Sequence, residues 1–417
     1  MEVCSAIFLS YQLFHERGKE WTHIAFRYPK FDIWPLELSE TKPIPYRPFR
    51  WGSYHITMGT RSMPWADWIE LDNQYQQYQR IRAHRIETQG PGVIQVLDDN
   101  ANPAVKGGHL AAIELVHELA EYLSRRYPTT FHVSRHTKPD VDYKWGWDGL
   151  PPIKTITVVP LNETHELPLS PFNGDWASER AMTISALLIQ DDLAVMIEGT
   201  DGRYYFQAGA ICVPGFWRMR DKIGMPLDEI HISGGVPQYR EKLHLSLERF
   251  FRRLPVEKPV IRNNYFLQTV RPQRDRMAGS IDPEELAWSE CTNGPENEFR
   301  NGDRFAPPKY RAAPTPEMLR LRSERQTLRR LPISGAIIFT IRTYLTPLEA
   351  LGREPGVPGR LASSMREWPR EVGDYKGKDR GTWYAMALAY LDKCHQEQLD
   401  RGEFEEGEKN RESGYPY

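Results

Sequence analysis

Polar and charged side chains recur at a spacing of two residues in two segments of the chain, which places them on one face if each segment is a β-strand. Arg262 and Asn264 form one such pair, and a guanidinium beside an amide can bind a carboxylate or donate hydrogen bonds to a ligand. Arg322, Glu324 and Gln326 form the other set, which on a strand makes an acid–base pocket. The alternatives are a solvated charged face in both segments, or an arginine that pairs with a neighbouring carboxylate.

The secondary structure of residues 319–331 decides which of these side chains meet. On a strand, Glu324 and Arg325 point to opposite faces, whereas a helix would bring Arg325 beside Arg329. A Pro-Ile-Ser-Gly turn signal follows this segment, and residues 336–345 are rich in Ile, Phe, Thr and Tyr. The pattern favours a hairpin of two strands.

A single histidine stands where a metal ligand would be well placed. His231 lies between an apolar turn at 225–227 and a Gly-Gly step at 234–235. A neutral imidazole in such surroundings is a competent ligand, and the alternative is a buried structural histidine that is bonded to a backbone carbonyl. His165 is the second candidate.

Four further segments have the β-branched and aromatic content of strands, namely residues 153–159, 193–198, 204–213 and 260–270. An Asp-Gly step separates the second from the third, which is typical of a β-hairpin. The fourth segment contains Arg262 and Asn264, so the sequence places both on a strand.

Three segments have the apolar spacing of amphipathic helices. Residues 107–127 end in two arginines and are followed by Pro128, which are typical signals of a helix C-terminus. Residues 238–254 and 383–399 show the same periodicity. Together with the strands, these helices indicate an α+β fold.

The chain divides into three parts by composition. Residues 1–52 are rich in proline and aromatic residues and form an extended arm, because proline fixes φ and interrupts strand ladders. Residues 53–348 form the main domain, in which residues 271–316 are polar, broken by Gly and Pro, and predicted to be a surface insertion or a lid. Residues 349–417 carry the last helix and, from residue 402, an acidic tail that we expect to be disordered.

The overall composition is that of an ordinary globular protein, with 40% hydrophobic, 12% aromatic and 26% charged residues. Lys and Arg total 54 against 56 Asp and Glu, so the chain lacks the basic excess of a nucleic-acid-binding protein. No run approaches the roughly 18 to 20 apolar residues of a membrane-spanning helix, and the N-terminus lacks the features of a signal peptide. We therefore expect a soluble cytoplasmic protein with no nucleic-acid or membrane partner.

Several chemistries lack their sequence motifs. The chain has no Gly-rich dinucleotide fingerprint, no P-loop and no Gly-x-Ser-x-Gly elbow. Its four cysteines are too scattered for a disulfide framework or for a zinc or iron–sulfur site.

An ordered set of motifs resembles the family of the haem-dependent oxidative N-demethylase α-subunit, including its fungal relatives. The resemblance runs from about residue 43 to residue 348, and the insertion matches poorly. The motifs that carry it are YHITMG at 54–59, WIELD at 68–72, QDDL at 190–193, AGAICVPGFW at 208–217, KIGMPLDEIH at 222–231, VPQY at 236–239, PVIRNNY at 259–265, LRSERQTLRRLP at 321–332 and FTIRTY at 339–344.

The resemblance implies a haem-binding PAS-like domain, an antiparallel sheet flanked by helices, that acts as an oxygenase. The implied reaction is the oxidative N-demethylation of a small secondary amine such as dimethylamine, with dioxygen as oxidant and formaldehyde as product. Electrons would come from a separate NADPH-dependent reductase that carries flavin and iron–sulfur centres.

The same resemblance implies roles for individual residues. His231 would ligate the iron of haem b, and the groups that surround the cofactor would be Arg262, Asn264, Arg325 and Tyr239. The catalytic groups on the oxygen-binding side would be Glu324, Arg322 and Gln326. Two alternatives stay open: a haem-based gas or redox sensor without turnover, and a scaffold protein that has lost haem.

Overall fold

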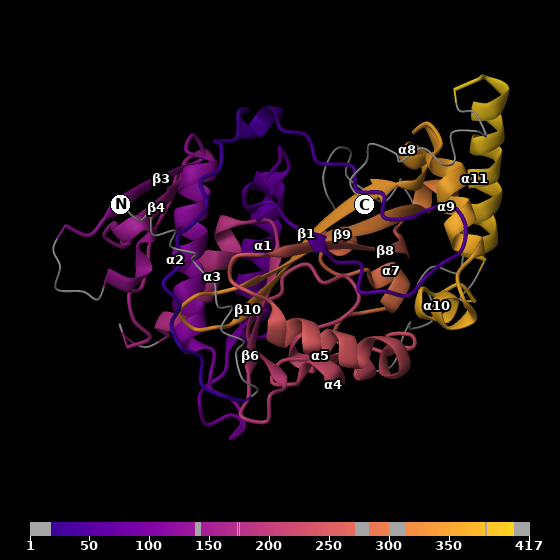
Figure 1. Cartoon of the computed structure of the whole chain (residues 1–417). Coiled ribbons are helices and arrows are strands. Elements are labelled where there is room, and N and C mark those ends of the chain that lie inside the picture. Colours follow the sequence, from indigo (N-terminus) through magenta and orange to yellow (C-terminus); the bar gives the residue numbers. More distant parts are fainter. Residues whose placement is uncertain are drawn as a thin grey trace, which may run out of the picture.

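A seven-stranded antiparallel sheet forms the centre of the computed structural model, which describes residues 18–137, 143–172, 174, 176–271, 283–299, 314–379 and 382–403. Its strands follow the order β1 (Arg61–Ser62), β8 (Val260–Thr269), β9 (Leu319–Arg330), β10 (Ile337–Pro347), β6 (Asp192–Glu198), β7 (Tyr204–Ala210) and β2 (Ile94–Val96). Helices surround the sheet, which confirms the predicted α+β class (Figure 1).

One face of this sheet packs on three helices and a small second sheet. The elements are α1 (Tyr75–Gln89), α2 (His109–Arg126), α3 (Ala177–Leu188), β3 (Phe131–Arg135), β4 (Ile153–Val158) and β5 (Glu163–Glu166). Leu193 and Val195 of β6 point into this core, whereas Ala194 and Met196 point to the other face. The alternation follows from the two-residue period of a strand, and it leaves a second apolar face to be covered.

The opposite face is covered by α4 (Leu227–Ser233), a π-helical turn (Tyr239–Leu243) and α5 (His244–Arg253) (Figure 1). Leu227 and Phe251 pack there against Met196 and Phe206. The predicted helix at 238–254 is thus present, and its first turn is π-helical.

Four helices after β10 pack against the ends of β8 and β9. They are α8 (Leu348–Gly352), α9 (Val357–Arg366), α10 (Arg370–Tyr375) and α11 (Trp383–Asp400). The last of them confirms the helix predicted at 383–399. None of the helices in the described ranges is long and apolar enough to cross a membrane.

β9 and β10 form the predicted hairpin, with Arg330 opposite Ile337 and Arg322 opposite Leu345. All twelve residues of β9 are buried although most of them are polar or charged. β9 is a central strand between β8 and β10, and both of its faces are covered. Its arginines must therefore find partners inside the protein.

The described part of the segment that was predicted to be a surface insertion or a lid contains buried residues. Between its two portions outside the described residues lie α6 (Pro283–Leu286) and α7 (Glu290–Asn293). Leu286, Trp288 and Cys291 are buried, and Trp288 Nε1 donates to the Gly294 carbonyl. The prediction was wrong here because a few apolar residues in a polar stretch suffice to anchor it. The acidic tail from residue 404 lies outside the described residues.

A buried ion pair joins β9 to α2. Arg329 donates to Glu118, and its guanidinium lies 4.3 Å from the ring centre of Trp68. Glu118 also accepts a hydrogen bond from Trp147 Nε1 at 2.9 Å. Both charged side chains are nearly inaccessible, so each depends on the other for compensation.

Replacing Arg329 with methionine is expected to lower the free energy of unfolding by about 3–5 kcal/mol, because the Glu118 carboxylate would stay buried without its counter-charge. Urea unfolding followed by circular dichroism measures the change. The control is Arg366→Met, whose pair with Asp392 is about half exposed on both sides and should contribute at most about 1 kcal/mol. Equal losses in the two variants would contradict the expectation.

Candidate functional site

A cavity of about 420 Å³ lies between the sheet and the elements α4, α5 and α10. Its volume is in the range that binds small molecules and cofactors. One part of its wall is apolar, and the side chains there come from β6, β7, β9, β10 and α5: Ala194, Met196, Phe206, Leu328, Phe339, Leu247, Phe250 and Phe251. The other part is polar, so the cavity has two chemically distinct ends.

The polar end is built by two neighbouring strands. Arg262 of β8 lies opposite Gln326 of β9, and Asn264 lies opposite Glu324. All four line the cavity, as expected for side chains two residues apart on strands. Four of the five polar residues that the sequence analysis singled out on the two strands thus meet at one wall, and Arg322 is the one that does not line it.

Hydrogen bonds orient the Glu324 carboxylate. Gln326 Nε2 donates to Glu324 Oε2 at 2.8 Å, and Asn264 Nδ2 lies 3.5 Å from the same oxygen. Arg322 Nε lies 3.7 Å from the other oxygen. The carboxylate is thus held in one orientation beside the cavity, where it can accept a proton or bind a cation.

Arg322 supports Glu324 from behind and is not among the residues that line the cavity. Its guanidinium donates to the Leu286 carbonyl at 2.9 Å and to the Val213 carbonyl. Gly215 makes room for it: a Cβ there would lie 2.5 Å from the guanidinium carbon, and Gly215 has a φ of 75°. Within the structure, Arg322 is a positioning group rather than a contact of a bound ligand.

Arg325 points to the opposite face of the sheet, away from the cavity. Its Nε lies 2.9 Å from Glu70 Oε1, and it donates to the Trp68 carbonyl at 3.2 Å. The implied role of Arg325 at the cofactor is corrected by this placement: the two-residue period of β9 puts odd and even positions on different faces.

His231 lines the cavity from α4, and its environment fixes its protonation. Nδ1 lies 2.6 Å from the Leu227 carbonyl, which can only accept, so Nδ1 carries the hydrogen and the lone pair is on Nε2. Nε2 has no hydrogen-bond partner among the residues that the structure describes. Burial lowers the pKa of His231 to about 4, although the bond to Leu227 opposes the shift. The imidazole is therefore neutral at physiological pH and able to ligate a metal.

Tyr239 holds the imidazole plane. Its ring stacks on His231 with the ring centres 4.8 Å apart and an angle of 10° between the planes. Tyr239 is buried, and its hydroxyl has no partner in the described part of the chain. His165, the second candidate ligand, lies on β5 near Glu163 and does not line the cavity.

Lys376, which follows α10, completes the polar end and was not among the predicted site residues. Its Nζ donates to the Tyr265 carbonyl at 2.6 Å and lies 4.6 Å from the ring centre of Phe266. Burial lowers the pKa of Lys376 to about 7, Glu324 opposes this shift, and Arg262 adds to it. A lone lysine in a Gly-rich segment carries no sequence signal for a pocket, so only the fold could reveal it.

The residues at this cavity fit a haem. The Nε of Arg262 is buried without a partner, and its side chain has no hydrogen bond or ion pair with any residue whose placement is described. Arg262 and Lys376 are therefore two cations suited to two carboxylates, and the opposite wall is apolar. The described ranges hold no cluster of three or more His, Cys, Asp or Glu that could bind a bare ion, whereas haem iron needs a single protein ligand.

The chain matches the sequence model of a protein family. The sequence model of the family described as haem-dependent oxidative N-demethylase, alpha subunit-like, matches residues 59–385. The matched region includes the strands β6–β10 and the helices α4, α5 and α10 that line the cavity, whereas residues 54–58, which also line it, precede the match. It extends past residue 348, where the resemblance of the motifs ended, and takes in Lys376.

Proposed function

The chain belongs to the haem-dependent oxidative N-demethylase alpha subunit-like family, and from this we propose that it removes a methyl group from a small secondary amine, using dioxygen and haem. The supporting observation is the cavity itself, with a neutral imidazole at one wall and unpaired cations beside an oriented carboxylate at the other. The position of the cavity, between an antiparallel sheet and short helices, also supports a PAS-like domain.

His231 is the residue that would hold the haem iron, through Nε2. Arg262 and Lys376 would bind the two propionates, because they are the cations at the polar end of the cavity, whereas Lys222, which also lines it, donates to Ser233 and to the Ile230 carbonyl. The bound haem supplies the activation of dioxygen. The apolar wall of the cavity excludes water from that chemistry.

Glu324 would bind the amine. Once the propionates neutralise Arg262 and Lys376, Glu324 is the anionic side chain that is left at the cavity wall. Its carboxylate can pair with the protonated amine and take up the proton that the amine loses before oxidation. Gln326 and Arg322 keep the carboxylate in place during this transfer. The methyl group leaves as formaldehyde.

Electrons must come from another protein. The sequence contains no nucleotide-binding motif and no set of cysteines for an iron–sulfur cluster. We therefore include a separate NADPH-dependent reductase with flavin and iron–sulfur centres in the proposal.

The proposal is tested by supplying haem to the purified chain and recording the absorption spectrum in oxidised, reduced and carbon-monoxide-bound forms. With an electron donor present, oxygen consumption and formaldehyde release should then depend on added dimethylamine. Gas binding without amine-dependent turnover would instead indicate a haem-based sensor. Absence of a Soret band in all forms would overturn both.

Haem affinity is expected to fall as the pH rises from about 7 to 9. In the haem-free protein Lys376 loses its proton near pH 7, whereas a bound carboxylate favours the ammonium form, so binding above pH 7 takes up a proton. The affinity should decrease by up to about tenfold per pH unit. Titration of haem into the protein, followed at the Soret band, measures this slope.

Two variants distinguish the contribution of Lys376 to haem binding from the contribution of Arg262. Lys376→Met should weaken binding at pH 6 and remove the slope, because no group at that position titrates. Arg262→Met should weaken binding at every pH and keep the slope, since a guanidinium stays charged throughout this range. A slope that persists in Lys376→Met would show that another group takes up the proton.

A further inference from the structure

Three aromatic rings connect the candidate iron ligand with the protein surface. His231 stacks on Tyr239 with ring centres 4.8 Å apart, and Tyr239 lies 5.7 Å from His244. The His244 side chain is 33% exposed and lies 3.1 Å from Glu248. The rings therefore form a short route from solvent to the cavity, through the π-helical turn and the start of α5.

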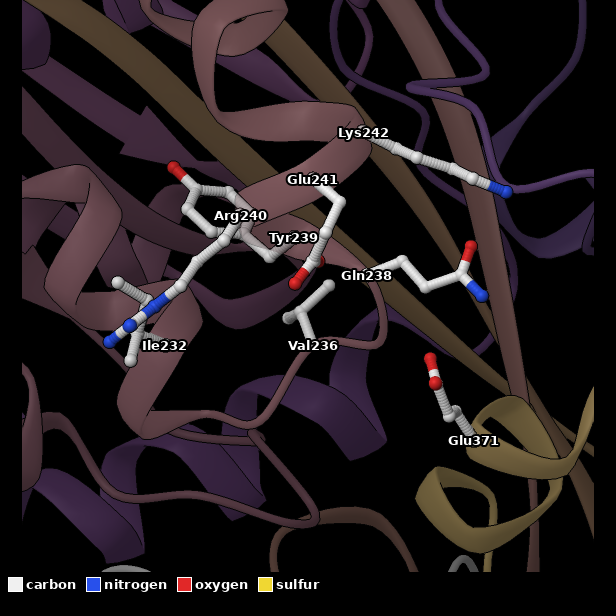
Figure 2. Close-up of a pocket in the computed structure, with 8 residues that line it drawn as sticks. All are labelled: Ile232, Val236, Gln238, Tyr239, Arg240, Glu241, Lys242 and Glu371. Carbon is white, nitrogen blue, oxygen red and sulfur yellow. The ribbon is translucent and has the colours of Figure 1, made fainter.

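The wall of the cavity is thin at this point. Val236 and Tyr239 line both the cavity and a separate depression of about 640 Å³ on the outside of the protein. Figure 2 shows this depression, with Arg240 and Lys242 extending in different directions from the π-helical turn and Glu371 of α10 on the other side. A molecule seated outside would be separated from His231 by little more than the Tyr239 ring.

Basic side chains outnumber acidic ones on the π-helical turn and α5, although the depression itself is lined by Glu241 and Glu371 as well as by Arg240 and Lys242. The π-helical turn and α5 present five basic side chains, which we call the basic surface: Arg240, Lys242, Arg249, Arg252 and Arg253. None of them has a side-chain hydrogen bond or ion pair to any residue in the described ranges. The acids of the same two elements are Glu241 and Glu248, and Glu248 is paired with His244.

We propose that the basic surface is the docking site of an acidic protein that carries one electron at a time, by flavin or iron–sulfur chemistry. The inference rests on the proposed function and adds where the electron enters. Unpaired cations attract a partner of opposite charge and raise its association rate. Exposed Leu245, at 70%, supplies the apolar contact that such an interface also needs.

A protein fits this surface better than a membrane does. The apolar side of α5 is already packed on the sheet, where Phe251 is 4% exposed and Phe250 lines the cavity. An amphipathic helix that binds lipid needs its apolar side free to enter the bilayer. Leu245 alone cannot replace that side.

The step is a transfer of one electron. The docked carrier would lose one electron, which a haem held by His231 would accept, with no bond formed or broken and no proton moved. Tyr239 and His231 lie on the route as a stacked pair.

The test reverses two charges of the basic surface. Arg249→Glu/Arg253→Glu is compared with Arg80→Glu/Lys154→Glu, which reverses two exposed cations on α1 and β4. The probe is reduced plant-type ferredoxin, an acidic iron–sulfur protein. Stopped-flow absorbance measures its rate of haem reduction, and anisotropy of labelled ferredoxin measures its binding to the haem-free chain.

For the wild type and the control, the reduction rate should be equal and should fall as salt is added. In Arg249→Glu/Arg253→Glu the second-order rate and the affinity should fall by about tenfold or more. Rates that match the control would overturn the proposal, as would binding of the wild type to phosphatidylserine-containing vesicles but not to ferredoxin.

Reduction by dithionite separates this inference from the proposed function. If haem binds and dithionite reduces all variants alike, an unchanged ferredoxin rate contradicts the docking site alone. If the wild type shows no Soret band, the proposed function fails and the docking site fails with it.

Discussion

Replacing His231 with alanine is expected to abolish the absorption spectrum that is typical of haem bound to a protein through a histidine. His231 lines the cavity with no hydrogen bond from a described residue on Nε2, and His55, which also lines it, is exposed, so the loss of His231 should leave the iron without its protein ligand. The fall in haem affinity should exceed the about 10- to 100-fold that is typical of losing a group behind a metal ligand. Haem titration followed at the Soret band measures it.

The matched control is His165→Ala. His165 is also a partly buried histidine, but it lies on the small sheet beside Glu163. Its removal should leave haem affinity and the Soret position unchanged. If instead His165→Ala loses haem while His231→Ala retains it, the cavity is not the haem site.

Replacing Glu324 with glutamine should reduce kcat/KM for the amine by about 10²- to 10⁴-fold, the range in which positioned acid–base groups act. Glutamine keeps the shape of the side chain and its contact with Gln326, but it cannot accept the proton of the amine. The haem spectrum should not change, because Glu324 supports the substrate rather than the iron. Formaldehyde release and oxygen consumption measure the effect.

Glu371→Gln is the control for this variant. Glu371 lies on α10 at the outer depression, is exposed, and does not line the cavity. Activity within about twofold of the wild type is expected, since exposed substitutions away from a site seldom change it. Full activity in Glu324→Gln would remove the carboxylate from the mechanism.

The periodicity of the sequence placed Arg262 and Asn264 on one face of a strand, and Glu324 and Gln326 on one face of another strand. Arg262, Asn264, Glu324 and Gln326 lie together because a strand repeats every two residues and β8 pairs with β9 in register. The same period also showed that Arg325 points the other way. The role of Arg325 at the cofactor came from the family resemblance, which contains no information on the direction of a side chain.

Contacts between segments that are distant in the chain could not be predicted from the sequence. Lys376 joins the cavity only because α10 packs back on β8, more than 100 residues earlier in the chain. α1 was missed for a related reason: its buried positions include Gln79 and Arg82, which are polar. Their partners, the Ile189 carbonyl and Asp192, come from elsewhere, so local hydrophobicity gave no helical pattern.

The buried arginines of β9 also determine where the chain can be divided. Arg325 forms an ion pair with Glu70, and Arg329 forms one with Glu118. Arg322 instead donates hydrogen bonds to the carbonyls of Val213 and Leu286. A shorter fragment that keeps β9 but omits one of these segments would bury a charge without its partner, at a cost of about 3–5 kcal/mol. A stable fragment must therefore hold β9 together with the segments that contain Glu70, Glu118, Val213 and Leu286, and fragments that omit one of these segments should yield no stable product on expression.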